Sequence, residues 1–322
     1  MLLTADPAVA AAALADGHLA AVPTETVYGL GARADLPHAV ARVYAAKGRP
    51  ADHPLIVHVR DAQAAWSWAS DVPPWAHALA EAFWPGPLTL VLPRSARAGD
   101  FITGGQDTVA LRVSAHPGFG QVLDQLATLL DDPSVGVAAP SANRFGRVSP
   151  TTAQHVVDEL TEALGPHDVI LEGGPSRVGV ESTIVDCTGP APVILRPGHV
   201  SAEQVEQVTG TPTGEHSTVR APGTLASHYA PRAAVSLISA EALDDLRPQD
   251  ARTGLLALAS IATPPGFVRL AAPENADDYA RDLYSALREA DALELSRVVA
   301  IPPSPAGIGA AVIDRLERAA TR

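Results

Sequence analysis

Short apolar runs of strand length recur along the first two hundred residues, and each is bounded by glycine, proline or polar residues. Runs of this length with such boundaries are typical of β-strands. The predicted strands are HLAAVP at 18–23, PLIVHV at 54–59, LTLVLP at 88–93, TVALRVS at 108–114, VGVAAP at 135–140, DVILEGG at 168–174, STIVDCT at 182–188 and VILRPG at 193–198.

Helical patterns lie between several of these runs. Residues 36–47 have a proline near their start and a glycine after their end, and residues 119–130 place their large apolar side chains on one face. Residues 201–208 open with a Ser-x-x-Gln capping box. Strands mixed with helices at this density indicate an α/β sheet domain, which we place at residues 1–208.

A second domain follows a linker. Residues 209–232 are rich in threonine, proline, glycine and serine and show no apolar period, which is typical of a linker. Beyond them, AAVSLIS, TGLLALAS and RVVAIP read as strands, with helices at 277–291 and 308–320. These elements predict a smaller, Rossmann-like α/β domain over residues 233–322. Its PAGIGAAV stretch lacks the third glycine of a dinucleotide fingerprint and does not predict such a site.

The composition is that of a folded protein with two domains: 322 residues, 47% hydrophobic and 18% charged. The single cysteine, Cys187, excludes an intramolecular disulfide and a cysteine-rich zinc site, and its apolar surroundings predict a buried, unreactive thiol. Residues 1–17 contain acids and no base, so we expect an amphipathic helix there rather than a signal peptide. No apolar run approaches the ~20 residues of a membrane span, and we expect a cytoplasmic protein with no membrane partner.

The net charge of −13 argues against broad binding of a nucleic-acid backbone. The charge is uneven, however. Residues 140–150 carry two arginines and no acid, whereas residues 153–173 carry five acids and no lysine or arginine. This distribution favours a small anionic ligand over an extended polyanion.

Lys47 is the only lysine in the chain, because 22 of the 23 basic residues are arginine. Its place at the end of a predicted helix suits a charge that stabilises the helix dipole. Arginine would serve that purpose equally well, and every other lysine or arginine position in the chain is arginine. A compact ammonium with three donors suits phosphate oxygens approached from varied directions.

Five polar clusters follow or precede the predicted strands, where α/β sheets place their ligands. They are PTETVYGLGA, KGRPADHP, PSANRFGRVSP, GGPSRVGVEST and LRPG. None contains the Gly-x-x-x-x-Gly-Lys pattern of a P-loop.

Single residues in these clusters also have structural explanations. Ser149, followed by proline, would cap the helix of TTAQHVVDEL, and Asn143 would suit a turn. His53 and His58 have no cysteine or paired acid nearby, so a metal site is not predicted. Arg112 lies inside an apolar run and needs an anionic partner, either a structural carboxylate or a ligand carboxylate.

Together these segments resemble the YrdC-domain threonylcarbamoyl-AMP synthase family in its longer, two-domain form. The resemblance covers nearly the whole chain. It rests on PTETVYGLGA, KGRP with PLIVHV, FWPGPLTLVL, TVALRV, APSANRFGRVSPT, GGPSRVGVESTIVD, LRPG, APGTLASHYAP and GIGAAVIDRLERAA, in that order.

The resemblance implies a twisted mixed-sheet YrdC-like domain and a specific reaction. L-threonine is carboxylated by bicarbonate, and the carbamate attacks the α-phosphorus of ATP to give threonylcarbamoyl-AMP and pyrophosphate. A tRNA threonylcarbamoyl transferase machinery then uses the product. Mg²⁺ is expected to accompany ATP, held mainly by phosphate oxygens and water.

The family's functional positions carry over to this chain as follows. The catalytic tetrad matches Lys47, Arg49, Ser141 and Asn143. The ATP-binding positions match Arg49, His53, Thr108, Ser141, Ser149, Arg196 and Tyr229. The L-threonine subsite matches Thr26, His58, Arg112, Ala139 and Ser182.

Two positions depart from the family pattern: His53 replaces an asparagine, and Thr224 in the linker replaces a methionine. The contribution of a histidine becomes sensitive to pH near its pKa of about 6.5. We further predict that linker 209–232 folds over the site as a lid with Tyr229 reaching the nucleotide, because closure protects a hydrolysable mixed anhydride from water.

Two other functions remain open at this point. An RNA-binding module would use the YrdC fold, but the acidic charge and the lack of aromatic–basic interleaving count against it. A carbamoyltransferase-type YrdC-like protein would be expected to carry zinc-finger cysteines, and this chain has one cysteine. Direct contact with tRNA is left undecided.

Overall fold

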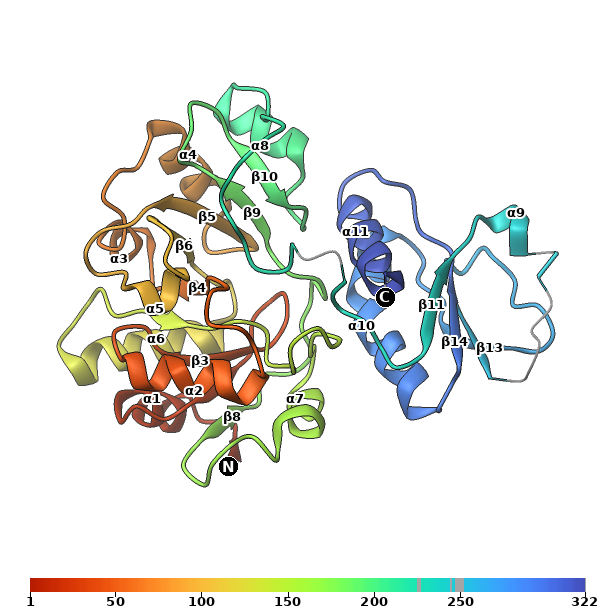
Figure 1. The fold of residues 1–322 in the computed structure, drawn as a ribbon, viewed down its shortest axis with the longest axis horizontal. Helices are drawn as coiled ribbons and strands as arrows, with labels where there is room; N and C mark the ends of the chain where they lie inside the picture. Colours follow the sequence, from red (N-terminus) through yellow and green to blue (C-terminus); the bar gives the residue numbers. More distant parts are fainter. Residues whose placement is uncertain (225–226, 244, 247–251, 322) are drawn as a thin grey trace.

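The computed structural model describes residues 1–224, 227–243, 245–246 and 252–321. Short pieces of the predicted linker and of the second domain, at 225–226, 244, 247–251 and 322, lie outside the described residues. The described residues form a large and a small α/β domain, shown from red to green and in blue in Figure 1. The predicted fold class is therefore confirmed.

The large domain is built on a mixed sheet of ten strands among the described residues. In spatial order they are β1 (Leu2–Thr4), β8 (Val169–Leu171), β2 (Ala20–Val22), β3 (Gly29–Arg33), β7 (Val137–Ala138), β4 (Ile56–His58), β6 (Thr108–Arg112), β5 (Leu88–Pro93), β9 (Thr183–Asp186) and β10 (Val193–Arg196). Strand β4 runs parallel to β6 and antiparallel to β7, and β2 forms an antiparallel hairpin with β3.

Helices cover both faces of this sheet and bury the apolar side chains of its strands. One face packs against α1 (Pro7–Ala15) and α6 (Pro117–Leu130). The other packs against α2 (Pro37–Lys47), α4 (Pro74–Phe83), α7 (Ala153–Leu160) and α8 (Ala202–Thr209), with the short α3 (Ala62–Trp66) and α5 (Asp100–Thr103). The capping box of α8 is present as predicted, and Gly48 ends α2 in the left-handed conformation.

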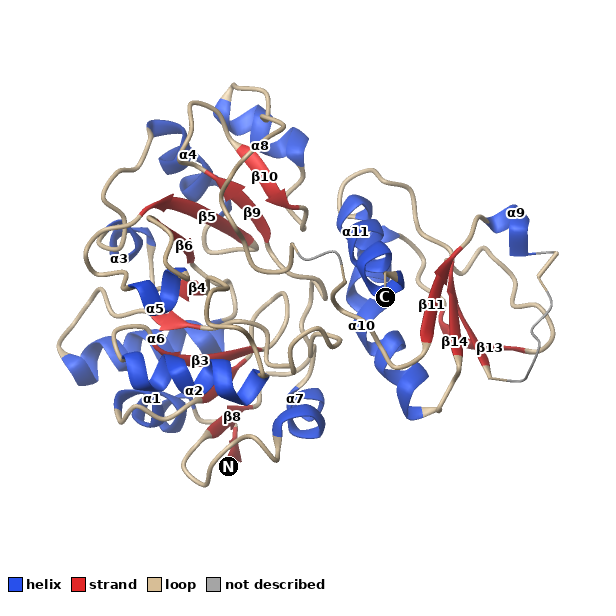
Figure 2. Ribbon diagram, viewed as in Figure 1, coloured by secondary structure: helices blue, strands red, loops and turns tan. Residues whose placement is uncertain are grey.

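The small domain has a parallel sheet of four described strands. In spatial order they are β11 (Ala234–Leu237), β14 (Arg297–Ala300), β12 (Thr253–Leu256) and β13 (Phe267–Ala271). Its helices are α9 (Ala240–Leu243), α10 (Ala276–Ala292) and α11 (Gly309–Ala320). Figure 2 shows α10 and α11 between this small sheet and the large domain, so both helices lie on the side of the small domain that faces the large one.

Two local predictions are wrong. Residues 2–4 are not helical but form edge strand β1, because the helix begins only at Pro7 with Asp6 as its N-cap. Ser149 does not cap the TTAQHVVDEL helix. Thr152 does so, since its side chain accepts from the backbone N–H of His155.

None of the helices in the described residues is long and apolar enough to cross a membrane. Cys187 is buried, as predicted, and burial raises the pKa of its thiol well above the ordinary value.

Candidate active site

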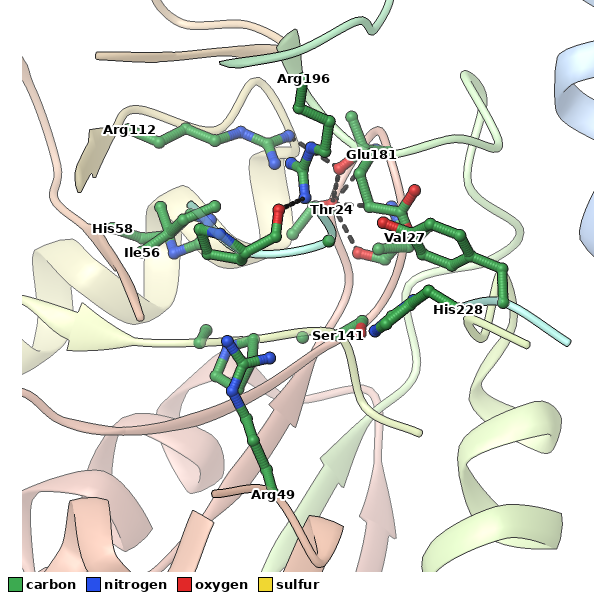
Figure 3. A pocket seen from close by; sticks show the side chains of 17 residues that line it. Thr24, Val27, Arg49, Ile56, His58, Arg112, Ser141, Glu181, Arg196 and His228 are labelled. Atoms are coloured by element: carbon green, nitrogen blue, oxygen red, sulfur yellow. Dashed lines mark hydrogen bonds between the residues drawn. The ribbon is translucent and has the colours of Figure 1, made fainter. Parts of the chain in front are cut away.

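A pocket lies where the ends of several central strands meet the linker (Figure 3). His58 at the end of β4 pairs in register with Arg112 at the end of β6. Gly29 at the start of β3 forms an isolated bridge with Ser141, which follows β7. The sheet therefore brings three polar clusters that are distant in the sequence to one place.

Arg112 is held by a buried carboxylate that the sequence analysis did not identify. Its Nη2 donates to Glu25 Oε1 at 2.8 Å and to Thr26 Oγ1 at 2.9 Å, while Ser114 donates to the other oxygen of Glu25 at 2.5 Å. Burial alone would raise the pKa of Glu25, but the Arg112 guanidinium and the Ser114 hydroxyl outweigh it and lower that pKa to about 2. No described residue accepts a hydrogen bond from Nη1 of Arg112, which leaves that donor for a ligand.

His58 is buried beside this network and packs on Phe119, with ring centroids 5.3 Å apart. Burial and the nearby Arg112 charge lower the pKa of His58 to about 3, so its imidazole is neutral at physiological pH. A neutral imidazole can both donate and accept a hydrogen bond, which suits recognition of an uncharged hydroxyl.

Lys47 occupies the end of α2 and does not line the pocket. Its ammonium is buried and donates to the backbone carbonyls of Ser141 at 2.5 Å and Asn143 at 2.6 Å. Burial and the neighbouring Arg49 lower the pKa of Lys47 well below the ordinary value. The lysine therefore attaches the loop after β7 to the end of α2 and fixes the position of Ser141.

Two further guanidiniums enter the pocket from opposite sides, Arg49 from one and Arg196 from the other (Figure 3). Arg49 donates to the carbonyl of Pro54, and Arg196 donates to the carbonyls of Ser182 and Pro222. Burial lowers the pKa of Arg49 to about 10 and lowers that of Arg196 as well. Desolvated guanidiniums with neutral partners favour an anionic ligand.

Buried polar atoms without a partner concentrate here. Among the described residues, five buried side-chain atoms lack a hydrogen-bond partner. Four of them belong to this region: Arg49 Nε, His58 Nδ1, Asn143 Oδ1 and His228 Nδ1. Buried polar groups are almost always paired in native proteins, so this concentration marks a site built for a polar ligand.

Glu181 is a carboxylate that lines the pocket among these arginines. It accepts from Ser149 Oγ at 2.6 Å, Tyr284 Oη at 2.8 Å and Arg315 Nε at 2.8 Å. Burial would raise the pKa of Glu181, but Arg315, Arg196 and the Ser149 hydroxyl lower it to about 2. Glu181 is therefore ionised and already fully engaged.

The linker closes the pocket. Pro222, Gly223, His228 and Tyr229 form one wall, and the remaining cavity is about 40 Å³. Pockets for small-molecule ligands typically hold about 300–1,000 Å³. Tyr229 is buried with a φ of 60°, a conformation that costs a non-glycine residue ~1–3 kcal/mol and persists only when its surroundings enforce it. The cavity in this state therefore has space for a few water molecules.

Eight of the predicted site residues line the pocket and six do not. Those that line it are Thr26, Arg49, His58, Arg112, Ala139, Ser141, Arg196 and Tyr229. Those that do not are Lys47, His53, Thr108, Asn143, Ser149 and Ser182. Three of the second group bond to residues that line it: Lys47 to Ser141, Ser149 to Glu181, and Ser182 to Arg196.

The other three predicted residues, Asn143, His53 and Thr108, have no such bond to a residue that lines the pocket in the part of the chain that the structure describes. Asn143 directs its side-chain amide to the carbonyls of Arg144 and Arg147, which closes the loop that carries Ser141. His53 is partly exposed, and its ring packs edge to face against Phe145 with centroids 5.4 Å apart. Thr108 begins β6 and lies four residues before Arg112, ~13 Å along the strand, so the structure does not bring it to the pocket.

Three residues that are buried in or beside the pocket were not predicted from the sequence: Glu25, Glu181 and His228. Each adjoins a predicted residue in the sequence: Thr26, Ser182 and Tyr229 respectively. For the two acids, this adjacency is the sequence feature that could have predicted them, because a carboxylate beside a predicted ligand residue in an arginine-rich site needs an explanation.

The chain matches two family models in succession. The model described as "Telomere recombination" matches residues 12–198, and the model described as "Threonylcarbamoyl-AMP synthase, C-terminal domain" matches residues 200–321.

Similar proteins cover the same length. A threonylcarbamoyl-AMP synthase of Pyrococcus abyssi is 38% identical, covering 97% of this chain and 93% of its own. One of Bacillus subtilis is 35% identical, covering 99% and 94%. The crystal structure of P. abyssi Sua5 complexed with L-threonine superposes with a TM-score of 0.85 and 36% identity, covering 99% of this chain and 97% of that one. These similarities extend over both domains, and the chain belongs to the threonylcarbamoyl-AMP synthase family.

Proposed function

We propose that this protein is an enzyme that makes threonylcarbamoyl-AMP and pyrophosphate from L-threonine, bicarbonate and ATP. The observation that carries the proposal is a pocket with Arg112 and His58 at one end and Arg49 and Arg196 on its other walls. An amino acid and a polyphosphate have one carboxylate and several phosphates, and this arrangement of guanidiniums suits both.

L-threonine is placed at the Arg112 end. The free Nη1 of Arg112 would bind its carboxylate, and Glu25 would keep the guanidinium plane fixed. The neutral imidazole of His58 would take the hydroxyl. Ala139, a small residue on the wall, leaves space for the methyl group.

ATP is placed between Arg49 and Arg196, with Ser141 beside them. These charges would stabilise the negative charge that grows on pyrophosphate as it leaves, which is the main task of a nucleotidyltransferase site. Lys47 would act by holding the Ser141 carbonyl, and with it the loop that carries Ser141, in place beside the phosphates.

Mg²⁺ would enter with the nucleotide. No group of three or more histidine, cysteine, aspartate or glutamate side chains suited to a metal occurs among the residues that the structure describes. Of the nearby carboxylates, Glu25 and Glu181 are both engaged with arginines. The phosphates and water are therefore the expected ligands, and no protein cage is assigned.

The reaction balances in two steps. Threonine ammonium and bicarbonate give the carbamate, water and a proton. A carbamate oxygen then forms a bond to the α-phosphorus of ATP while the bond from that phosphorus to the α,β-bridging oxygen breaks, releasing pyrophosphate. The product is a mixed anhydride that water hydrolyses, which favours a closed site. A tRNA threonylcarbamoyl transferase machinery would consume it. The RNA-binding and carbamoyltransferase alternatives are not favoured.

Incubating the purified protein with ATP, L-threonine and bicarbonate tests this function. We expect pyrophosphate release that requires all three, and a lower kcat/KM with L-serine by ~10-fold because a lost methyl contact is worth about 1–3 kcal/mol. Pyrophosphate release that does not depend on threonine would contradict the assignment.

The lid gives a second prediction. Tyr229→Ala removes the ring that packs between His228 and Tyr284, so the linker should close less often. We expect more hydrolysed threonylcarbamoyl-AMP per pyrophosphate released, by several-fold, because water reaches the anhydride. Deleting residues 209–322 should have the same effect. Unchanged synthesis without extra hydrolysis in both variants would remove the lid from the proposal.

A further inference from the structure

The small domain inserts two side chains into the large one. Tyr284 on α10 and Arg315 on α11 are both fully buried, and their hydrogen-bond partners Glu181 and Pro197 belong to the large domain. A buried guanidinium and a buried phenol require partners, and here the partners belong to the other domain and the linker.

Arg315 contacts three segments that each contribute to the pocket. Its Nε donates to Glu181 Oε2 at 2.8 Å, and its Nη2 donates to the carbonyl of Pro197 at 3.0 Å. Its guanidinium carbon lies 5.2 Å from the ring centre of Tyr229. Glu181 and Tyr229 line the pocket, and Pro197 directly follows Arg196, which lines it as well.

Tyr284 completes the same arrangement. Its hydroxyl donates to Glu181 Oε2 at 2.8 Å, and its ring stacks on Tyr229 with centroids 5.7 Å apart. The ring of Tyr229, whose backbone is left-handed, is therefore in contact with two side chains of the small domain. The second oxygen of Glu181 accepts from Ser149, in the segment that follows the Ser141 loop.

We infer that Arg315 and Tyr284 are positioning residues for the nucleotide half of the active site. They fix the Glu181 carboxylate, the backbone beside Arg196 and the closed state of the Tyr229 linker. The small domain thus completes the ATP site without touching substrate. This inference rests on the proposed function, because it needs ATP to bind between Arg49 and Arg196.

A purely structural role predicts a different outcome. If the two side chains only held the domains together, their loss would lower stability and affect both substrates alike. A positioning role acts on one half of the pocket, because no contact of Arg315 or Tyr284 reaches Arg112, Glu25 or His58 in the described structure.

The test compares Arg315→Lys and Tyr284→Phe in the full-length protein by steady-state pyrophosphate release. Lysine keeps the charge and loses the planar fork, and phenylalanine keeps the stacked ring and loses only the hydroxyl. We expect KM for ATP to rise on the order of tenfold for Arg315→Lys and about threefold for Tyr284→Phe, with KM for L-threonine within twofold of the unmodified protein. The matched control is Arg297→Lys in β14, whose guanidinium bonds to Ser236 inside the small domain, and both KM values should stay unchanged.

Two further measurements separate the outcomes. Thermal unfolding of each variant reports folding, and Tyr284→Phe serves if Arg315→Lys does not fold. A double-mutant cycle with Glu181→Gln should show that the KM effects of Arg315→Lys and Glu181→Gln are not additive. An unchanged KM for ATP in a folded Tyr284→Phe variant, or an equal rise in both KM values, would overturn the inference. Absence of threonine-dependent pyrophosphate release in the unmodified protein would instead reject the proposed function.

Discussion

Replacing Lys47 with arginine is expected to lower kcat for pyrophosphate release by ~100-fold or more while the protein still folds. The ammonium lies between two carbonyls, those of Ser141 at 2.5 Å and Asn143 at 2.6 Å, in a space without solvent. A planar guanidinium is wider and cannot donate to both carbonyls from that point. The loop must shift by about an ångström, and such a misplacement of a catalytic group costs ~100-fold in rate.

Steady-state rates at saturating ATP and L-threonine check this, with circular dichroism and thermal unfolding to verify the fold. Lys47→Met separates charge from shape, because it keeps the chain length and leaves both carbonyls unpaired. The matched control is Arg42→Lys on the same helix, whose partner Asp168 lies away from the pocket. Full activity of Lys47→Arg would contradict this prediction and would mean that Lys47 contributes only a positive charge at the C-terminal end of α2.

The strands of the large domain could be predicted where apolar runs end in polar residues. Strand β3 could not, because its GLGAR sequence contains two glycines, which are depleted in strands. Gly31 is required by packing: a Cβ there would lie 2.8 Å from Val137 Cγ1 and 3.0 Å from the Ala20 carbonyl oxygen. Close approach of neighbouring strands leaves no pattern in the sequence.

Eight of the fourteen predicted positions line the pocket, but the electrostatics of the pocket could not be predicted. The resemblance to a family identified Arg112 and Arg196 but did not indicate what balances them. Arg112 is paired with Glu25, and Glu181, the carboxylate near Arg196, is itself paired with Arg315; these pairs join residues 87 and 134 positions apart. Pairing at such separations depends on the tertiary fold. No short stretch of the sequence indicates which acid pairs with which arginine.

Arg112→Gln should raise KM for L-threonine by ~100-fold while KM for ATP changes little. The reason is that Nη1 of a guanidinium fixed by Glu25 gives the substrate carboxylate a charge-assisted hydrogen bond, which an amide replaces only weakly. The change also leaves Glu25 as a buried carboxylate without its cation, and breaking a buried pair in this way costs ~3–5 kcal/mol. Arg112→Lys, which keeps the charge, should fold better and still bind threonine poorly.

Glu25 also gives the variant a distinct dependence on pH. In the unmodified protein its pKa of about 2 lies below the unfolded value, so the pair stabilises the fold above pH 4.5 and is lost as pH falls toward 2. Without Arg112, burial dominates and the pKa of Glu25 rises above the unfolded value, which reverses the sign. As the pH falls from 7 to 5, the melting temperature of Arg112→Gln should therefore rise relative to that of the unmodified protein. Glu25→Gln combined with Arg112→Gln should abolish that pH dependence without restoring threonine binding. A normal KM for threonine in the double variant would show that Arg112 does not bind the substrate carboxylate.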